Sequence, residues 1–251
     1  YAEGQTCVTE PAPTRDHTER MLAGLGYTVQ REGSRACLTG GGRLVACDID
    51  VPADISSAAF FLVGATIAKD SDLTLEHVGM NPTRIGVINI LRLMGANIEV
   101  FNEREVGGEP VADLRVRAAS LHGIAIPEDQ VPLAIDEFPA LFIAAACARG
   151  ETVLTGAAEL RVKETDRIAT TSAALEGIGL RLAGRPDGFT VEGPGTITGG
   201  RVDAAGDHRL AMLGAVAALA SGTGVAVEDF ACVAVSYPGF ARDLATLGAA
   251  A

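Results

Sequence analysis

The sequence predicts an α/β fold built from stacked copies of one helix–strand unit. Four stretches share a pattern of a leucine, two further residues, an apolar residue and a glycine, ending at Gly26, Gly95, Gly179 and Gly248. Between them lie helical stretches of a second kind, which begin at an aspartate and are apolar almost all round. Recurrence at about 70–85 residues is typical of repeat architectures, in which each copy buries its apolar face against its neighbours.

The four glycines are expected to end surface helices, because glycine readily adopts the left-handed conformation at a helix C-terminus. Runs of residues with strand-like patterning follow the first three of these helices. The runs lie at 27–31, 36–38 and 49–51, at 97–102, 113–116 and 123–126, and at 180–183, 189–192 and 200–203.

The second kind of helix is expected to be buried, because a helix that is apolar all round belongs inside a protein. Each of these helices begins at an aspartate, which is a good N-cap residue: Asp54, Asp136 and Asp207. A short strand follows each, at 73–76, 152–155 and 225–228. The predicted unit is therefore a buried helix, a strand, a surface helix and two or three further strands.

The predicted copies are incomplete at both ends of the chain. Residues 1–50 contain only the second half of a unit, and the last unit stops at Gly248, after its surface helix. The chain also begins at Tyr1 rather than at a methionine. We therefore expect a fragment or a processed piece, whose missing strands come from a segment upstream.

Composition is that of an ordinary globular protein, with 48% hydrophobic and 21% charged residues among 251. The net charge of −12 argues against a nucleic acid or an anionic membrane as a partner. The longest apolar runs, near 138–148 and 210–220, are too short to span a bilayer.

The five cysteines and four histidines show no spacing typical of a metal site. The odd number of cysteines fits free, mostly buried thiols in a reducing compartment. We therefore expect a cytoplasmic protein that needs no metal.

The most informative stretch is 160–167, which reads Leu-Arg-Val-Lys-Glu-Thr-Asp-Arg at the predicted start of a helix. Lys163 and Arg167 are four residues apart, so they would share a helix face and repel each other by a few tenths of a kcal/mol. Cations in a first turn also oppose the helix dipole. These local costs predict a negatively charged ligand, with Glu164 as a candidate for proton transfer. The alternative is a solvated helix start with internal salt bridges.

Three further arginines, Arg15, Arg84 and Arg209, each fall in the predicted first turn of a helix, and Pro82 is expected at the first helical position before Arg84. Any one of them has a simple alternative, an arginine paired with an N-cap aspartate or with solvent. Together with Arg167, they indicate helix N-termini that converge on an anion-binding cleft.

Asp136 is either a plain N-cap or a carboxylate that faces the same cleft as a base or hydroxyl acceptor. His17 and His208 are candidates for proton relay, and a structural role is the alternative for each. Ser56 and Ser57 are expected to cap and pack the first buried helix.

Several motifs together resemble the enolpyruvyl transferase family, and most closely its 5-enolpyruvylshikimate-3-phosphate synthase branch. The motifs lie at 81–84, 135–139, 160–167, 206–212 and 235–240, and the resemblance runs from about Thr14 to Gly248. It implies an inside-out α/β barrel of repeated βαβαββ units. Residues 1–52 would then end the family's N-terminal domain. Residues 53–251 would form the C-terminal domain, with three repeat units of which the last is incomplete.

The resemblance also implies a reaction. The family transfers the enolpyruvyl group of phosphoenolpyruvate to the 5-hydroxyl of shikimate 3-phosphate and releases phosphate, without a metal or an organic cofactor. By motif, Asp136 corresponds to the carboxylate on the shikimate hydroxyls, commonly assigned as proton acceptor. Glu164 corresponds to the group proposed to move protons at the phosphoenolpyruvate methylene, and Lys163 contacts substrate.

The remaining substrate-binding candidates follow from the same resemblance. Arg167 and Arg209 correspond to phosphoenolpyruvate contacts, and Arg15 corresponds to a contact to the shikimate phosphate. His208, in the same motif as Arg209, is included among the substrate-binding candidates. The chemistry requires such residues, because two anionic substrates must be brought together against their repulsion.

Two alternatives remain open at this point. One is the related UDP-N-acetylglucosamine enolpyruvyl transferase, and the other is a non-catalytic anion-binding module on the same fold. Because the family's N-terminal contacts would lie upstream of Tyr1, we expect the chain alone to be inactive or nearly so. We expect the full-length parent to be a monomer.

Overall fold

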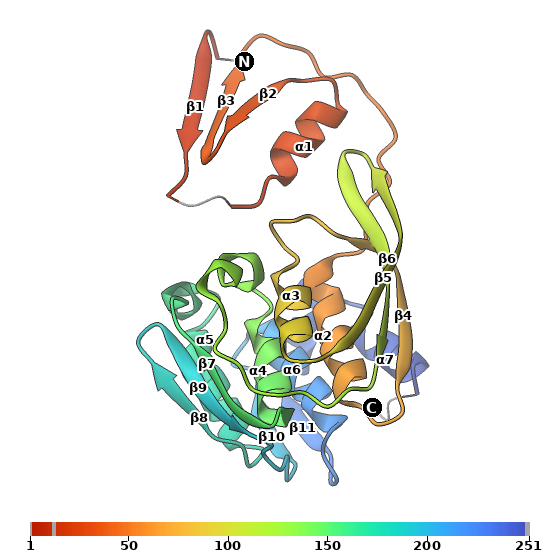
Figure 1. The fold of residues 1–251 in the computed structure, drawn as a ribbon, viewed down its shortest axis with the longest axis vertical. Helices are drawn as coiled ribbons and strands as arrows, with labels where there is room; N and C mark the ends of the chain where they lie inside the picture. Colours follow the sequence, from red (N-terminus) through yellow and green to blue (C-terminus); the bar gives the residue numbers. More distant parts are fainter. Residues whose placement is uncertain (1, 12–13, 249–251) are drawn as a thin grey trace.

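The computed structural model describes residues 2–11 and 14–248. Residues 1, 12–13 and 249–251 lie outside the described residues. The chain forms a small upper lobe and a larger lower lobe (Figure 1). The upper lobe contains β1 (Gln5–Thr9), α1 (His17–Gly24), β2 (Val29–Glu32) and β3 (Arg35–Thr39). Residues 42–52, which carry no regular secondary structure, lead from one lobe to the other.

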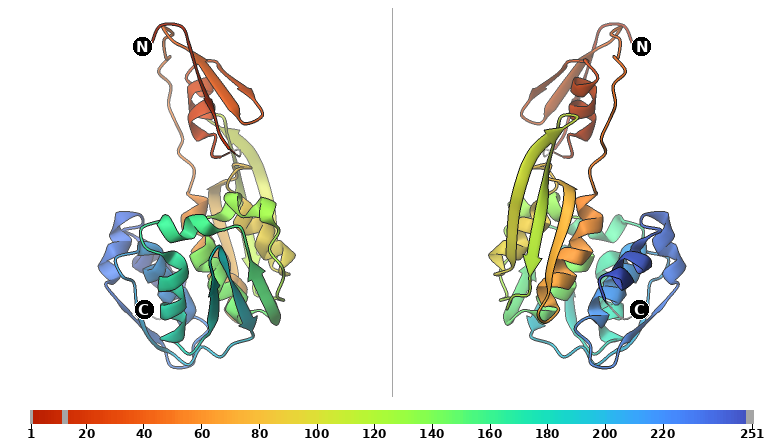
Figure 2. Two further views of the ribbon diagram at one scale, coloured as in Figure 1. Left: turned by 90° about the vertical axis from the view of Figure 1, so that its left-hand side faces the viewer. Right: turned by 90° about the vertical axis from the view of Figure 1, so that its right-hand side faces the viewer.

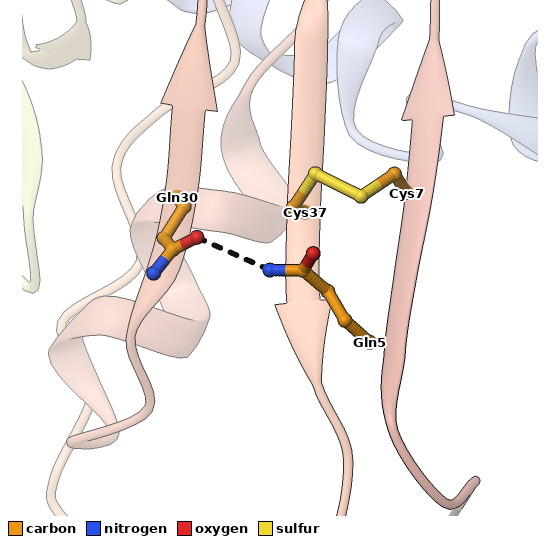
Figure 3. Close-up of a disulfide and its surroundings, with 4 residues drawn as sticks. All are labelled: Gln5, Cys7, Gln30 and Cys37. Carbon is orange, nitrogen blue, oxygen red and sulfur yellow. Dashed lines mark hydrogen bonds between the residues drawn. A yellow bond between two sulfur atoms is a disulfide. The ribbon is translucent and has the colours of Figure 1, made fainter.

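The upper lobe is an antiparallel sheet in the order β1-β3-β2, packed beside α1. Its register places Cys7 opposite Cys37, with 4.1 Å between their Cα atoms, and the two form a disulfide (Figure 3). The expectation of free, mostly buried thiols is therefore wrong for this pair, and it is also wrong for Cys47, which is exposed. The two bonded cysteines are 30 residues apart, and only the strand register brings them together.

The lower lobe contains three copies of one unit. The first has α2 (Ile55–Ile67), β4 (Asp72–Gly79), α3 (Gly86–Leu93), β5 (Asn97–Val106) and β6 (Glu109–Arg117). The second has α4 (Phe138–Cys147), β7 (Gly150–Leu154), α5 (Arg167–Glu176), β8 (Leu182–Arg185) and β9 (Gly188–Gly193). The third has β10 (Gly200–Asp203), α6 (His208–Ala218), β11 (Val225–Glu228) and α7 (Phe240–Thr246). Short 3-10 helices are η1 (Glu128–Gln130), η2 (Pro132–Ala134), η3 (Ala158–Val162) and η4 (Phe230–Val235).

Each copy begins with a β-α-β arrangement. In the third, β10 and β11 pair in parallel on either side of α6 in the sequence. In the first two, isolated parallel bridges take the place of β10, joining Ala53 to Val78 in the first copy, and His122 to Arg149 and Ala125 to Val153 in the second. Two antiparallel strands follow the second helix of the first two copies, in sheets ordered β4-β6-β5 and β7-β9-β8. The first two copies therefore have the βαβαββ order.

The first helix of each copy is inside, and the sheets are outside. Helices α2, α4 and α6 contact one another, and almost every residue of α2 and α4 is buried. The three sheets surround them, as the two side views show (Figure 2). The prediction of an inside-out α/β fold is confirmed, since a helix that is apolar all round must be covered on every side.

The predicted ends of the surface helices are also confirmed. The four repeated glycines all adopt positive φ angles, between 80° and 98°, at Gly26, Gly95, Gly179 and Gly248. Two strand predictions are wrong. Residues 49–51 belong to the exposed segment between the lobes, and 123–126 contribute only an isolated bridge at Ala125. Within residues 2–11 and 14–248, each helix is too short or too polar to cross a bilayer.

The core of the second copy depends on the contact between α4 and β9. Phe142 and Phe189 are fully buried, with ring centroids 4.1 Å apart. We predict that Phe142→Ala lowers the free energy of unfolding by about 3–5 kcal/mol, because it removes buried apolar area and leaves a cavity. Urea unfolding followed by circular dichroism measures the change.

The matched control is Leu93→Ala at the end of α3, where the side chain is 49% exposed. This change is expected to alter the free energy of unfolding by less than about 1 kcal/mol. Equal effects of the two substitutions would contradict the placement of α4 in the core.

Candidate functional site

Asp136 lies two residues before α4, which begins at Phe138. It is not the N-cap predicted from the sequence. Glu137 occupies that position without a side-chain capping bond, and Pro139 lies in the first turn, where no N–H is needed. The Asp136 side chain is 13% exposed and is free to engage other groups.

Four cations from three segments of the chain converge on Asp136. Arg15, from the upper lobe, forms an ion pair with its carboxylate. Lys163 Nζ lies 3.3 Å and Arg167 Nη1 3.6 Å from Oδ1 of the same carboxylate. Arg209 Nη1 donates to the backbone oxygen of Asp136 over 2.7 Å. The predicted convergence of these cations is therefore present.

The charge around Asp136 determines its protonation. Burial alone would raise the pKa of its carboxyl group. The hydrogen bond from Arg15 and the charges of Arg209 and Lys163 outweigh burial and place the pKa well below the usual range. Asp136 is therefore an anion in the unliganded site.

The sequence predicted that these cations lie in the first turns of helices, and this prediction is wrong in part. Helix α5 begins at Arg167, with Asp166 as its N-cap accepting from Ala169 N over 3.1 Å. Lys163 lies in the turn before it and shares no helix face with Arg167.

Two more predicted helix starts differ from the structure. Arg15 precedes α1, which begins at His17. Pro82 and Arg84 lie in the turn before α3, where the Asn81 side chain accepts from Thr83 N. Of the cations predicted in first helical turns, Arg167 and Arg209 are found there, whereas Arg15, Arg84 and Lys163 lie outside the helices.

Arg167 is fully buried, at 0% side-chain exposure. Its Nε donates to Asp207 Oδ2 over 2.8 Å, and its Nη2 forms an ion pair with Glu164. Asp207 is also fully buried and caps α6 by accepting from Arg209 N over 2.9 Å. One carboxylate thus fixes the starts of α5 and α6 together.

Two guanidinium nitrogens of this cluster are buried without a hydrogen-bond partner in the described part of the chain. They are Arg167 Nη1 and Arg209 Nε. Unpaired buried donors are uncommon in folded proteins, and a cationic donor without a partner favours an anionic ligand. Burial, reinforced by the nearby Arg167, lowers the pKa of Arg209 against the opposite influence of Glu137 and Asp136.

Glu137 is the site residue that sequence reasoning missed. It is 1% exposed, accepts a hydrogen bond from the Ser56 hydroxyl, and lies 3.9 Å from Arg209 Nη1. Burial raises its pKa. Ser56 also receives a hydrogen bond from Arg84, so it links α2 to the site. Ser57 instead donates its backbone N–H to Asp54, which is the N-cap of α2. The sequence did offer one signal for Glu137, because it is a charged residue inside the largely apolar stretch 135–143.

The remaining candidates divide between two places. Glu164 is 49% exposed and contacts Arg167. His208 begins α6 beside Arg209, and burial together with the Arg209 charge lowers its pKa. His17 instead lies at the junction of the lobes, where its Nδ1 is 2.6 Å from Glu109 Oε1. Across the described ranges, no three His, Cys, Asp or Glu side chains group in a way that could hold a metal.

We predict that Asp207→Asn destabilises the chain by about 3–5 kcal/mol at pH 7, because it leaves the buried Arg167 charge without its partner. Asparagine keeps the N-cap acceptor for α6, so capping is preserved. Urea unfolding at pH 7 measures the loss. A matched control is Asp166→Asn, which caps α5 but pairs at the surface with Arg161 and should cost less than about 1 kcal/mol.

The Asp207→Asn variant also tests how the free energy of unfolding depends on pH. Burial would raise the pKa of Asp207, but Arg167 and the Arg209 backbone N–H outweigh it, so the pKa is lowered. Its stabilising contribution is therefore present above the unfolded-state pKa of about 3.9 and is lost as the pH falls through the folded-state value. Below about pH 4 the wild-type chain should lose stability more steeply than Asp207→Asn, and parallel pH profiles would contradict the assignment.

The chain was compared with known families and curated proteins. The model of the EPSP synthase (3-phosphoshikimate 1-carboxyvinyltransferase) family matches residues 1–244. The 3-phosphoshikimate 1-carboxyvinyltransferase of Alkalilimnicola ehrlichii is 66% identical over 240 residues, covering 96% of this chain and 54% of the relative. That of Methylococcus capsulatus is 62% identical, covering 99% of this chain and 56% of the relative. The chain thus spans about half the length of these relatives.

Solved structures agree. The EPSP synthase of Acinetobacter baumannii superposes with a TM-score of 0.95 at 53% identity, covering 99% of this chain and 57% of that one. The enolpyruvyl transferase NikO of Streptomyces tendae has a TM-score of 0.78 at 21% identity over 99% of this chain and 56% of that one, which shows a shared fold. The resemblance found in the sequence is confirmed, and the chain belongs to the EPSP synthase family.

Proposed function

We propose that the full-length protein containing this chain transfers the enolpyruvyl group of phosphoenolpyruvate to the 5-hydroxyl of shikimate 3-phosphate and releases phosphate. Family membership and the shared name of the relatives support this proposal. The observation that carries it is a pair of buried guanidinium nitrogens, Arg167 Nη1 and Arg209 Nε, that make no hydrogen bond to the described residues, with the Asp136 carboxylate 3.6 Å from the first. Such a site can bind an anionic substrate at the two arginines and hold its reaction partner next to the carboxylate that would accept a proton.

Phosphoenolpyruvate is proposed to bind at Arg167 and Arg209. The unpaired Arg167 Nη1 and Arg209 Nε would donate to its carboxylate or phosphate oxygens. Because Asp207 fixes both helix starts, these donors need little reorganisation when the ligand binds. Lys163, with its side chain 20% exposed beside Asp136, would add a third positive charge.

Shikimate 3-phosphate is proposed to bind at Arg15 and Asp136. In the unliganded chain these two residues pair with each other, and the Arg15 side chain is 42% exposed. A substrate phosphate would compete for Arg15, because a phosphate presents more acceptor oxygens than a carboxylate. Asp136 would then be released to accept the substrate hydroxyl, and losing the Arg15 hydrogen bond would raise its pKa toward the value of a useful base.

The proton transfers follow from this arrangement. The 5-hydroxyl oxygen attacks C2 of phosphoenolpyruvate and gives its proton to Asp136, while Glu164 or Lys163 supplies a proton to the C3 methylene. In the second step a C3 proton returns to that group, phosphate leaves with its bonding electron pair, and the enol ether remains. Arg167 contacts the carboxylates of both Asp136, the proposed base, and Glu164, the proposed acid. A ligand bound to Arg167 would therefore lie next to both groups.

The proposal concerns the full-length protein, because this chain covers 54–57% of the relatives quoted above. We propose that residues 1–52 end one domain and 53–251 form the other, and that the parent is a cytoplasmic monomer that uses no metal or organic cofactor. UDP-N-acetylglucosamine enolpyruvyl transfer is less favoured, because the close relatives carry the shikimate name.

We predict that Glu164→Gln in the full-length protein lowers kcat by about 100- to 10,000-fold, because it removes the proton donor at C3. The KM values should change much less. Steady-state release of phosphate, with shikimate 3-phosphate and phosphoenolpyruvate as substrates, measures both constants.

The matched control is Glu176→Gln, at the exposed end of the same helix α5, for which we expect wild-type constants. A Glu164→Gln enzyme with wild-type kcat would reject the assigned role of Glu164 and favour Lys163 as the proton donor, whereas a wild-type protein that binds both substrates without turnover would favour an anion-binding module.

We also predict that this chain, purified alone, turns over phosphoenolpyruvate at less than about a thousandth of the full-length rate, because part of the substrate contacts would be absent. Phosphate release by equal concentrations of both proteins compares them. A rate within tenfold of the full-length protein would show that the described residues suffice.

A further inference from the structure

A small polar contact joins the two lobes, and Asn81 is at its centre. The segment 42–51 between the lobes is exposed and without regular structure, so it does not fix their orientation. The hairpin of β5 and β6 extends up to α1 (Figure 2), and α1 contacts β6. We propose that Asn81 is a positioning residue that fixes the upper lobe so that Arg15 faces Asp136. This inference rests on the proposed function for its effect on substrate.

The side chain of Asn81 is almost fully bonded. It is 2% exposed, and its amide nitrogen donates to Asp16 Oδ1 over 2.7 Å and to Glu109 Oε2 over 3.0 Å. Its oxygen accepts from the backbone nitrogen and the hydroxyl of Thr83, over 2.9 and 2.7 Å. The backbone donor at Thr83 sets the orientation of the amide, so its two N–H groups must point at the carboxylates.

One of these hydrogen bonds, from Asn81 to Asp16, crosses between the lobes. Asp16 belongs to the upper lobe, whereas Asn81 and Glu109 belong to the lower lobe. Arg20 adds bonds from the upper lobe, donating to Asp16 over 2.9 Å and to the Gly108 oxygen over 3.2 Å. Burial would raise the pKa of Asp16, but the hydrogen bonds from Arg20 and Asn81 outweigh it and lower the pKa. Asp16 is therefore an anion, and each bond to it is charge-assisted.

The position of Asp16 explains why this contact matters for the site. It directly follows Arg15, which is the member of the Asp136 cluster that comes from the upper lobe. The ion pair between Arg15 and Asp136 involves a side chain that is 42% exposed, and such solvent-exposed pairs contribute little to stability. The hydrogen bond from the buried Asn81 amide to the ionised Asp16 carboxylate is charge-assisted and therefore stronger. Asn81 therefore determines where Arg15 lies.

The test uses the full-length protein and the variant Asn81→Ala. We expect the dissociation constant for shikimate 3-phosphate to rise by about 10- to 100-fold, the change that loss of one charge-assisted hydrogen bond between the lobes produces. At saturating substrate the lobes are drawn together again, so kcat should stay within about threefold of wild type. Without ligand, small-angle X-ray scattering should give a larger radius of gyration than for the wild type.

The matched control is Asn89→Ala, which removes an asparagine bonded to Gln130 within the lower lobe, over 2.8 Å. It should leave the dissociation constant and the scattering unchanged. A second variant, Asp16→Asn, tests the same contact from the upper lobe and guards against misfolding of Asn81→Ala, because the Asp16 side chain makes no capping bond to α1.

The outcomes separate the two proposals. Wild-type dissociation constants and scattering for both Asn81→Ala and Asp16→Asn would overturn the positioning role. If the wild-type protein does not bind shikimate 3-phosphate while both variants still enlarge the radius of gyration, the proposed function fails and the role of Asn81 in placing the upper lobe stands. A loss of kcat without a change in the dissociation constant would also overturn the positioning role.

Discussion

The buried ion pair between Arg167 and Asp207 is the interaction on which the site depends. Each side chain is fully buried, so neither charge has water to stabilise it, and each needs the other. Asp207 uses its second oxygen to cap α6, and Arg167 is the first residue of α5. The two helix starts are therefore fixed against each other by one carboxylate. Because the pair consumes only part of the guanidinium, Arg167 retains a nitrogen for another anion.

The repeated unit explains why so many polar groups meet at one end of an apolar core. Helices α2, α4 and α6 are equivalent members of the three copies, and they contact one another in the centre. Their N-terminal ends carry Asp54, Glu137 and Asp207, which contact Arg84, Arg209 and Arg167 respectively. Copies of one unit thus supply the same kind of group from three directions, and the apolar remainder of each helix stabilises the arrangement.

The upper lobe contributes to this site through a single short segment. Arg15 reaches Asp136, and the next residues bond to Asn81 and Glu109. The contact is polar and small, which is typical of lobes that can move relative to each other. The disulfide between Cys7 and Cys37 lies within the upper lobe sheet, so it stiffens that lobe without crossing to the other.

The sequence by itself determined the fold class, the repeat and most of the site, because these depend on local patterns: apolar periodicity, glycines at helix ends, and the motif at 160–167. It placed Asp136, Lys163, Arg167 and Arg209 in one cluster, although it wrongly assigned Lys163 and Arg15 to first helical turns. Only the tertiary structure decided the partners of Glu137 and Asn81, and the bond between Cys7 and Cys37. These contacts join residues 30 to 81 positions apart, and no local pattern encodes such contacts, because strand register and helix packing set them.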